Sequence, residues 1–395
     1  MSVSQPHLHY YTGALAIAEA LIAKPSVTPN DAGCQDFLCE RLELLGFTCT
    51  RLQVNGVSNL LARIGSGPRH VAFNGHTDVV PAGDLSRWHS KPFEPVVKAG
   101  RLYGRGAADM NTGLAAMLAA CEGFDWQTLA PDLTFWWLIT SDEEGEAEDG
   151  SLAIQHYLRK QGVKLSSVLI AEPTAASAAG DCIKVGRRGS LSGRVNICGR
   201  QGHVAYPKQT INAALIAAKV ATALANTEFE QGSTDFPGTT LQVTQIDSGA
   251  HVDNLVPGRA SVAFNVRYAS DFNEMSLKRL LENQITAVGA DIEILWERPC
   301  EAYLSNPADD QGCLINPAEA AIFKQLGRFP VLSTAGGTSD GRFFASEQTQ
   351  VIEVGVSNQT IHQANESIAL EDLEQLTGIF RHILPDWLGR QSSQR

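Results

Sequence analysis

Histidine and carboxylate residues stand at the ends of apolar, strand-like segments of this chain. HVAFNG precedes His76 and Asp78, LTFWWLITSD precedes Glu143 and Glu144, and SVLIA precedes Glu172. Apolar runs of this length are typical of strands that are buried on both faces of a sheet. In open α/β sheets, ligands bind outside the carboxyl ends of the strands. The pattern therefore predicts an α/β fold that gathers these side chains into one site.

The order of helical and strand-like patterns divides the chain into two domains. Strands alternate with helices up to about residue 187, and a helix followed by a strand returns after about 302. Between these limits the order is roughly ββαββαβ, which suits an antiparallel sheet with helices on one face. We predict a domain with a mixed, largely parallel sheet flanked by helices, formed by 1–187 and 303–395. An α+β domain with an antiparallel sheet, residues 188–302, interrupts it, and the exposed sheet edges offer a partner chain a place to pair.

Charge and composition exclude several classes of protein. The formal net charge of −12 argues against non-specific binding of nucleic acid. The sequence contains neither an apolar run of the ~18 residues needed to span a membrane nor an amino-terminal secretory signal. The eight cysteines form no CxxC pair, so neither a zinc ribbon nor a redox motif is indicated. We expect a cytoplasmic protein with reduced thiols.

The candidate ligands are of a kind that suits a catalytic metal site. Imidazole and carboxylate without thiolate favour zinc, cobalt or manganese. Two histidines, His76 and His362, and three or more carboxylates exceed what one catalytic zinc needs, whereas a bridged two-metal site uses that many. An isolated strand-end histidine is usually a surface residue, and SDEEGEAEDG alone is equally typical of a solvated acidic loop. The combination of several such loops favours the metal site.

The adjacent glutamates Glu143 and Glu144 indicate a division of labour. One carboxylate can bind metal while its neighbour acts as the general base on metal-bound water. Asp78, two residues beyond His76, is placed to hold the second imidazole nitrogen and fix the tautomer.

The chain contains four segments, FNGHTDVVP, YGRGAADMNTG, ITSDEEGE and IAEPT, and the late His362. In these segments and this histidine it resembles the co-catalytic zinc aminoacylase and carboxypeptidase family. The resemblance covers almost the whole chain. It implies that Glu143 is the general base and that two zinc ions are bound, the first by His76, Asp109 and Glu172 and the second by Asp109, Glu144 and His362. It also implies a cis Asp109–Met110 peptide.

The same resemblance makes the inserted domain a lid and dimerisation domain. It implies a homodimer in which His203, in GRQGHVAYP, stabilises the oxyanion in the neighbouring subunit's site.

The segments GRRGSLSG, QGHVAYP, NLVPG, GGTSDGRF and NQTIHQANE resemble the branch of this family that cleaves N-succinyl-LL-2,6-diaminopimelate. Such a substrate is an anionic N-acyl amino acid, and arginine recognises carboxylates bidentately. The resemblance implies six substrate-binding residues, namely Arg187, Asn254, Arg267, Gly337, Thr338 and Asn358. Acetylornithine deacetylase or a related N-acyl-amino-acid deacylase is the alternative, followed by a metallo-dipeptidase or a non-catalytic metal-binding protein.

Overall fold

A computed structural model describes residues 13–145, 147–305 and 313–389. The expectation that the chain has no secretory signal rests on its amino-terminal residues. Residues 1–12 lie outside the described ranges. The chain forms two compact units, called here the first unit (Met1–Val185, Ser305–Ser333 and Ser339–Arg395) and the second unit (Gly186–Leu304 and Thr334–Thr338). The short segment Thr334–Thr338 groups with the second unit, whereas the sequence places it in the first domain.

The first unit is built on an eight-stranded sheet with the order β1-β2-β6-β3-β7-β18-β8-β17. Strands β6, β3, β7 and β18 are adjacent and parallel, while β1 and β2 run antiparallel at one edge. All eight residues of β6, LTFWWLIT, are buried, as expected for a strand covered on both faces. The predicted mixed, largely parallel sheet is confirmed. Its strands are β1 (Thr48–Val54), β2 (Val57–Gly65), β3 (Arg69–His76), β6 (Leu133–Thr140), β7 (Leu165–Ile170), β8 (Cys182–Lys184), β17 (Val331–Ser333) and β18 (Gln350–Glu353).

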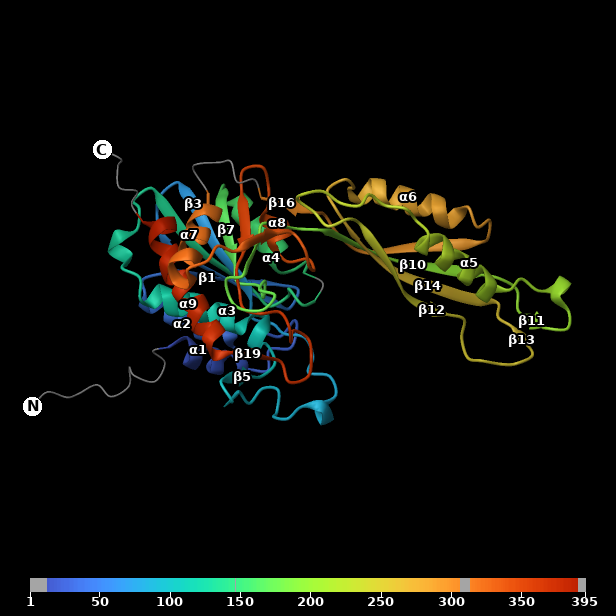
Figure 1. The fold of residues 1–395 in the computed structure, drawn as a ribbon, viewed down its shortest axis with the longest axis horizontal. Coiled ribbons are helices and arrows are strands. Elements are labelled where there is room, and N and C mark those ends of the chain that lie inside the picture. Colours follow the sequence, from blue (N-terminus) through green and yellow to red (C-terminus); the bar gives the residue numbers. More distant parts are fainter. Residues whose placement is uncertain (1–12, 146, 306–312, 390–395) are drawn as a thin grey trace, which may run out of the picture. The chain divides into compact units, whose positions relative to one another are not determined.

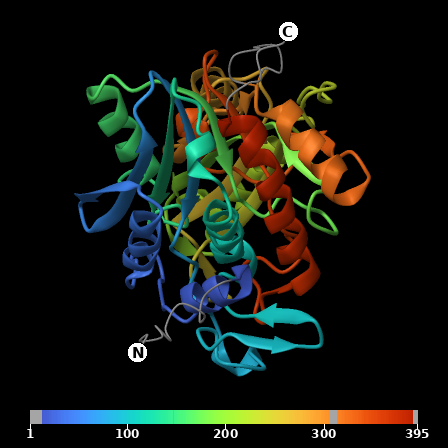
Figure 2. The same ribbon diagram turned by 90° about the vertical axis from the view of Figure 1, so that its left-hand side faces the viewer.

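Helices cover both faces of this sheet. Five of them share one hydrophobic core with Phe73 and Phe135: α1 (Ala14–Ile22), α2 (Cys34–Leu44), α3 (Thr112–Glu122), α7 (Ile315–Leu326) and α9 (Leu370–Leu388). Figure 2 shows α3 and α9 in front of the sheet. The other face carries α4 (Ser151–Lys160) and the short α8 (Gly341–Phe344), which contact β6, β7 and β18.

A small three-stranded sheet joins two parts of the first unit that are distant in sequence. It consists of β4 (Val96–Lys98), β5 (Arg101–Tyr103) and β19 (Ser367–Ala369), and β19 pairs with β5. A π-helical turn, η2 (Ala107–Asn111), then leads into α3. The segment before β19 is therefore held beside the segment after β5. Two single turns of 3-10 helix, η1 (Leu85–Arg87) and η3 (Trp126–Thr128), complete this unit.

The second unit has the predicted antiparallel sheet, with the strand order β12-β14-β10-β15. Its strands are β10 (Gly189–Cys198), β12 (Thr240–Asp247), β14 (Arg259–Tyr268) and β15 (Ile292–Cys300). The helices α5 (Ala213–Ala225) and α6 (Glu274–Thr286) contribute to a core with this sheet, and they contact each other (Figure 1). Two short pairs, β9 (Gly186–Arg187) with β16 (Tyr303–Leu304) and β11 (Gly202–His203) with β13 (Leu255–Val256), and the 3-10 turn η4 (Pro207–Gln209) account for the rest.

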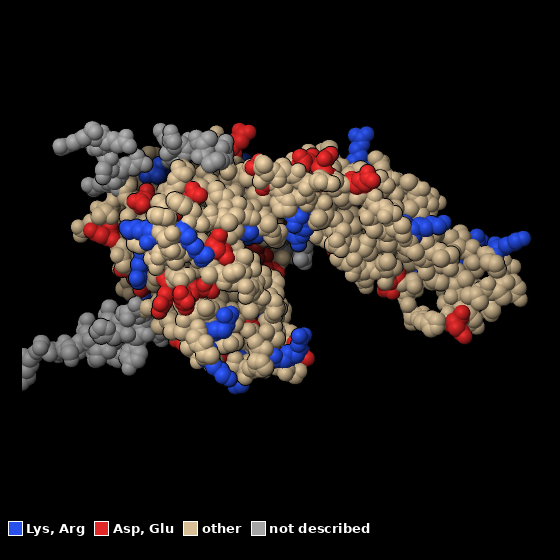
Figure 3. Space-filling model, in the orientation of Figure 1, with Lys and Arg blue, Asp and Glu red and all other residues tan. Residues whose placement is uncertain are grey.

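No helix in the described ranges is long and apolar enough to cross a membrane. Figure 3 shows basic and acidic side chains interspersed over the visible face of both units.

Candidate metal centre

The parallel strands deliver four of the predicted ligands and bases to one edge of the first unit's sheet. His76 is the last residue of β3, Glu143 and Glu144 follow β6, and Glu172 follows β7. Because these three strands are adjacent and parallel, their carboxyl ends lie together. Asp109 comes from the π-helical turn before α3, and its peptide bond to the next residue is cis.

The carboxylate of Asp109 lies between two imidazole rings. Its Oδ1 is 3.2 Å from Nε2 of His76, and its Oδ2 is 3.5 Å from Nε2 of His362. Oε1 of Glu172 is 3.4 Å from the same nitrogen of His76, and Oε1 of Glu144 is 3.1 Å from that of His362. Two donor sets therefore meet at one shared carboxylate.

The spacing of these donors fits a pair of divalent cations. Ligands bound at ~2.0–2.1 Å in a tetrahedral arrangement lie about 3.3–3.4 Å from one another. The four separations in this centre run from 3.1 to 3.5 Å. A ligand oxygen of Glu143 also lies within 4.8 Å of ligand atoms of His76 and Glu172. That glutamate is therefore beside the donor sets and within reach of the same space.

Asp78 supports the centre through two different groups. Nδ1 of His76 donates to the backbone carbonyl oxygen of Asp78 at 2.8 Å, while the carboxylate is farther away, at 3.6 Å. The carboxylate instead accepts the backbone N–H groups of Glu143 at 3.3 Å and Glu144 at 3.1 Å. Nδ1 of His76 is thus held by the main-chain carbonyl of Asp78, the residue predicted to hold it. This contact leaves Nε2 of His76 available to a cation.

A buried glutamate holds the loop that carries Asp109. Glu366 is 1% exposed, and its Oε1 accepts the backbone N–H groups of Ala108 at 2.8 Å and Asp109 at 3.1 Å. Its Oε2 accepts the N–H of Gly106 at 3.1 Å and Nη1 of Arg105 at 2.7 Å. These four bonds go to four of the five residues from 105 to 109. Glu366 therefore positions the shared carboxylate, a role that the sequence did not predict.

Burial and mutual repulsion perturb the acids of the centre. Burial raises the pKa of Glu143 well above its ordinary value, and the charge of Glu172 raises it further. Burial also raises the pKa of Glu172 to about 7, and the charge of Asp109 adds to the effect. The pKa values of the two histidines are also raised, and hydrogen bonds to Asp109 and Glu144 bring the pKa of His362 to about 10. Burial lowers the pKa of His76, but its bonds to Asp109 and Glu172 outweigh burial and leave it well above the ordinary value.

Metal binding is expected to release at least two protons per chain at neutral pH, because the cations must displace the protons on the two imidazoles and any proton on Glu172. Protons compete with the cation, so the apparent affinity for metal should fall as the pH is lowered from about 10, the pKa of His362, and fall further below about 7, where Glu172 also gains a proton. Calorimetric titration in buffers of different ionisation enthalpy measures the release. Heats that do not depend on the buffer would contradict this expectation.

One predicted substrate residue, Asn358, lies in the first unit. It follows β18, and its backbone N–H donates to the carbonyl of Ala175 at 3.0 Å. Its side chain is half-buried. The other five predicted substrate residues and His203 lie in the second unit.

Within the second unit, three of these residues surround a glycine turn. Nη1 of Arg187, in β9, donates to the carbonyl oxygen of Gly337 at 3.4 Å. Gly336 has φ +110, and a Cβ there would lie 2.8 Å from that same guanidinium nitrogen, so glycine is required for this close approach. Oγ1 of Thr338 is 2.8 Å from Sγ of Cys300.

Arg267, on β14, carries a polar atom that the described protein leaves unsatisfied. Its Nη1 is buried with no hydrogen-bond partner among the described residues. Burial lowers the pKa of Arg267, and the charge of Arg188 acts in the same direction. A buried guanidinium N–H without a partner is costly, so this position suits an anionic ligand.

His203 and Asn254 lie on and beside the short pair β11 and β13. Nδ1 of His203 accepts the backbone N–H of Ala205 at 3.1 Å, so a neutral ring carries its proton on Nε2. The carbonyl oxygen of Asn254 accepts the N–H of Val204 at 3.1 Å. Both side chains are exposed, and His203 presents a hydrogen-bond donor to the solvent.

Comparison with known proteins shows relatives over nearly the whole chain. The chain is 55% identical, over 94% of its length and 95% of the relative's, to "Succinyl-diaminopimelate desuccinylase 1" of Alteromonas mediterranea. It is 48% identical, over 92% of its length and 97% of the relative's, to "Succinyl-diaminopimelate desuccinylase 2" of Shewanella loihica.

Solved structures share the fold at lower identity. The metallo-carboxypeptidase Sso-CP2 of Sulfolobus solfataricus aligns with a TM-score of 0.79 at 18% identity, covering 94% of this chain and 98% of that one. A dinuclear metal-binding peptidase of Bacillus subtilis, YXEP, aligns with a TM-score of 0.66 at 15% identity, covering 96% and 98%. The model of "Peptidase family M20/M25/M40" matches residues 72–386, a range that includes every donor described above, and the chain belongs to this family.

Proposed function

We propose that this protein hydrolyses the amide bond of N-succinyl-LL-2,6-diaminopimelate to give succinate and LL-2,6-diaminopimelate, a step of diaminopimelate and lysine biosynthesis. The observation that carries the chemistry is the Asp109 carboxylate between His76 and His362, with Glu143 beside it. The names of the relatives at 55% and 48% identity support the choice of substrate.

Two divalent cations suit the two donor sets, and zinc fits their mixture of imidazole and carboxylate best, with cobalt or manganese as the alternatives. One set is His76, Asp109 and Glu172, and the other is Asp109, Glu144 and His362. When bound, the cations would polarise the amide carbonyl and lower the pKa of water.

In this proposal, Glu143 moves the proton. Its carboxylate takes a proton from the attacking water and delivers it to the amide nitrogen, while the carbon–nitrogen bond breaks and the water oxygen becomes part of succinate. A general base that must later act as an acid works best with a pKa near the working pH. Burial raises the pKa of Glu143 in that direction.

The substrate is anionic and the protein has a net negative charge, so local arginines must attract it. We assign the substrate carboxylates to Arg187 and to Arg267, whose buried Nη1 has no protein partner among the described residues. Asn254, Thr338 and Asn358 would supply further hydrogen bonds, and Gly337 would let the backbone approach the ligand.

We further propose a homodimer in which Nε2 of His203 donates to the oxyanion in the partner's site. The hydrogen bond from Ala205 to Nδ1 supports this role, because it favours the tautomer with the proton on Nε2. The exposed edge strand β12 is available for pairing between subunits. A cytoplasmic location agrees with eight cysteines that form no disulfide among the described residues.

Hydrolysis of N-succinyl-LL-2,6-diaminopimelate and acetylornithine by the zinc-loaded protein, measured side by side, tests the substrate. Substituting Arg187→Ala is expected to raise KM about tenfold or more for the succinyl compound, because a bidentate contact to a carboxylate is lost. The effect on an acetyl substrate should be much smaller. The exposed Arg194→Ala serves as the control, and equal effects of Arg187→Ala on both substrates would overturn the assignment.

A further inference from the structure

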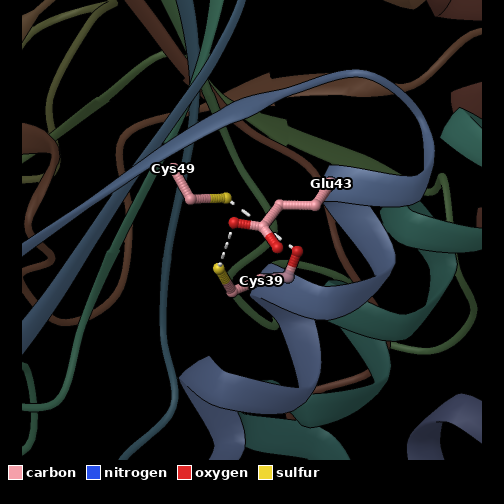
Figure 4. A group of neighbouring side chains, drawn as sticks. All are labelled: Cys39, Glu43 and Cys49. Carbon is pink, nitrogen blue, oxygen red and sulfur yellow. Dashed lines mark hydrogen bonds between the residues drawn. The ribbon is translucent and has the colours of Figure 1, made fainter.

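A second group of metal-binding side chains lies in the first unit, where α2 meets β1. Cys39 and Glu43 are four residues apart on α2 and so share one face of that helix, and Cys49 comes from β1. The two sulfur atoms and a carboxylate oxygen all lie within 4.8 Å of one another. Figure 4 shows the three side chains pointing toward one another. The sequence did not predict this group, because its cysteines are ten residues apart and form no CxxC motif.

The backbone that carries these three side chains is firmly placed. Leu38 and Leu42, on the same helix, are fully buried in the core of the first unit. Gly46, with φ +91, turns the chain between α2 and β1. Cys49 itself stands opposite Ala62 in the ladder between β1 and β2. The donors are thus held by a packed helix and a paired strand, which is how a preorganised site is built.

The carboxylate of Glu43 is exposed and accepts only a weak hydrogen bond within the group. Sγ of Cys39 donates to Oε1 of Glu43 at 3.5 Å, and Sγ of Cys49 donates to the carbonyl oxygen of Cys39 at 3.9 Å. Both are weak hydrogen bonds. Among the described residues, no basic side chain forms an ion pair with Glu43. A cation would replace both weak bonds and neutralise the carboxylate.

We propose that Cys39, Glu43 and Cys49 bind one thiolate-seeking divalent cation of the zinc and cadmium class, at a site separate from the carboxylate and histidine centre. Two thiolates and a carboxylate supply three positions of a tetrahedral site, and the exposure of Glu43 lets water take the fourth. Sulfur donors disfavour magnesium and calcium, which prefer oxygen. The bound ion would join the carboxyl-terminal turn of α2 to β1.

Binding at this site exchanges protons for metal. The Sγ atoms of Cys39 and Cys49 both donate hydrogen bonds, so each carries a proton when no cation is bound. A coordinated thiol is deprotonated, and two protons leave as two metal–sulfur bonds form. No oxidation or reduction is involved.

Titration of the reduced, metal-free protein with cobalt tests the proposal, because sulfur-to-cobalt charge transfer gives an absorption band that nitrogen and oxygen donors do not give. The donor sets around Asp109 contain only nitrogen and oxygen, so the band reports the cysteine site alone. We expect the band to saturate at one thiolate-bound ion per chain, in addition to the ions of the first centre. Cys49→Ser should abolish the band, and Glu43→Gln should weaken cobalt binding at this site at least about tenfold.

Matched controls separate this site from general effects on the protein. Cys198→Ser removes an exposed cysteine elsewhere, and Glu40→Gln changes an exposed glutamate on the same helix, so both should keep the band. Because Glu43 is exposed, Glu43→Gln is expected to fold normally and to keep its hydrolytic activity. Absence of the band in the reduced wild-type protein, or its persistence in Cys49→Ser, would overturn the proposal.

Discussion

Substituting Glu143→Gln is expected to reduce kcat by about 10²- to 10⁴-fold, because general acid and base catalysis by one side chain contributes on this order. An amide cannot take a proton from water or return it to the leaving amine. The substitution leaves all five proposed ligands in place, so the variant should still bind two metal ions. Steady-state kinetics together with metal content per chain measure both parts of this expectation.

The exposed Glu148→Gln, in the same acidic loop, is the matched control and should retain wild-type kcat. A Glu143→Gln protein that holds two ions and hydrolyses substrate as fast as the wild type would rule out this glutamate as the base.

Substituting Glu366→Gln is expected to lower the free energy of unfolding by about 3–5 kcal/mol, because Arg105 is 2% exposed and would lose its ionised partner. The carboxylate also accepts three backbone N–H groups, including that of Asp109. A glutamine must turn its own N–H groups toward one of these donors. The displaced loop should weaken metal binding about 10- to 100-fold. Denaturant unfolding of the metal-free protein and a metal titration measure the two effects.

Glu374→Gln, an exposed glutamate on α9, provides the control and should change neither quantity appreciably. Unaltered metal affinity in a folded Glu366→Gln protein would show that the loop holds Asp109 without this carboxylate.

The sequence predicted correctly those parts of the fold in which the local pattern of apolar residues matches their burial in the structure. The apolar runs before His76, Glu143 and Glu172 are buried parallel strands, and their ends meet as the general rule for α/β sheets requires. The change from alternating strands and helices to a strand-rich order also marked the antiparallel sheet. These features depend on short-range periodicity, which a single sequence displays directly.

Other features depend on contacts that no local pattern encodes. Glu366 lies 257 residues from Asp109 in sequence, and long-range contacts such as the pairing of β19 with β5 bring its segment near. The carboxylate of Asp78 binds the backbone after β6, although its position beside His76 suggested a bond to the imidazole. The sharing of Asp109 between two donor sets came from the family resemblance, since strand ends alone do not specify which carboxylate lies in the middle.

The strand order of the first unit also bears on how the polypeptide folds as it is synthesised. Strand β18 lies between β7 and β8, yet more than 160 residues separate the end of β8 from the start of β18. The ribosome must therefore release the whole second unit before the central sheet can close. Contacts this distant slow folding, and until they form, β7 and β8 present open edges. A nascent chain that stops before β18 would lack His362 and Glu366 as well, so the ability to capture a metal pair arises only when synthesis is nearly finished.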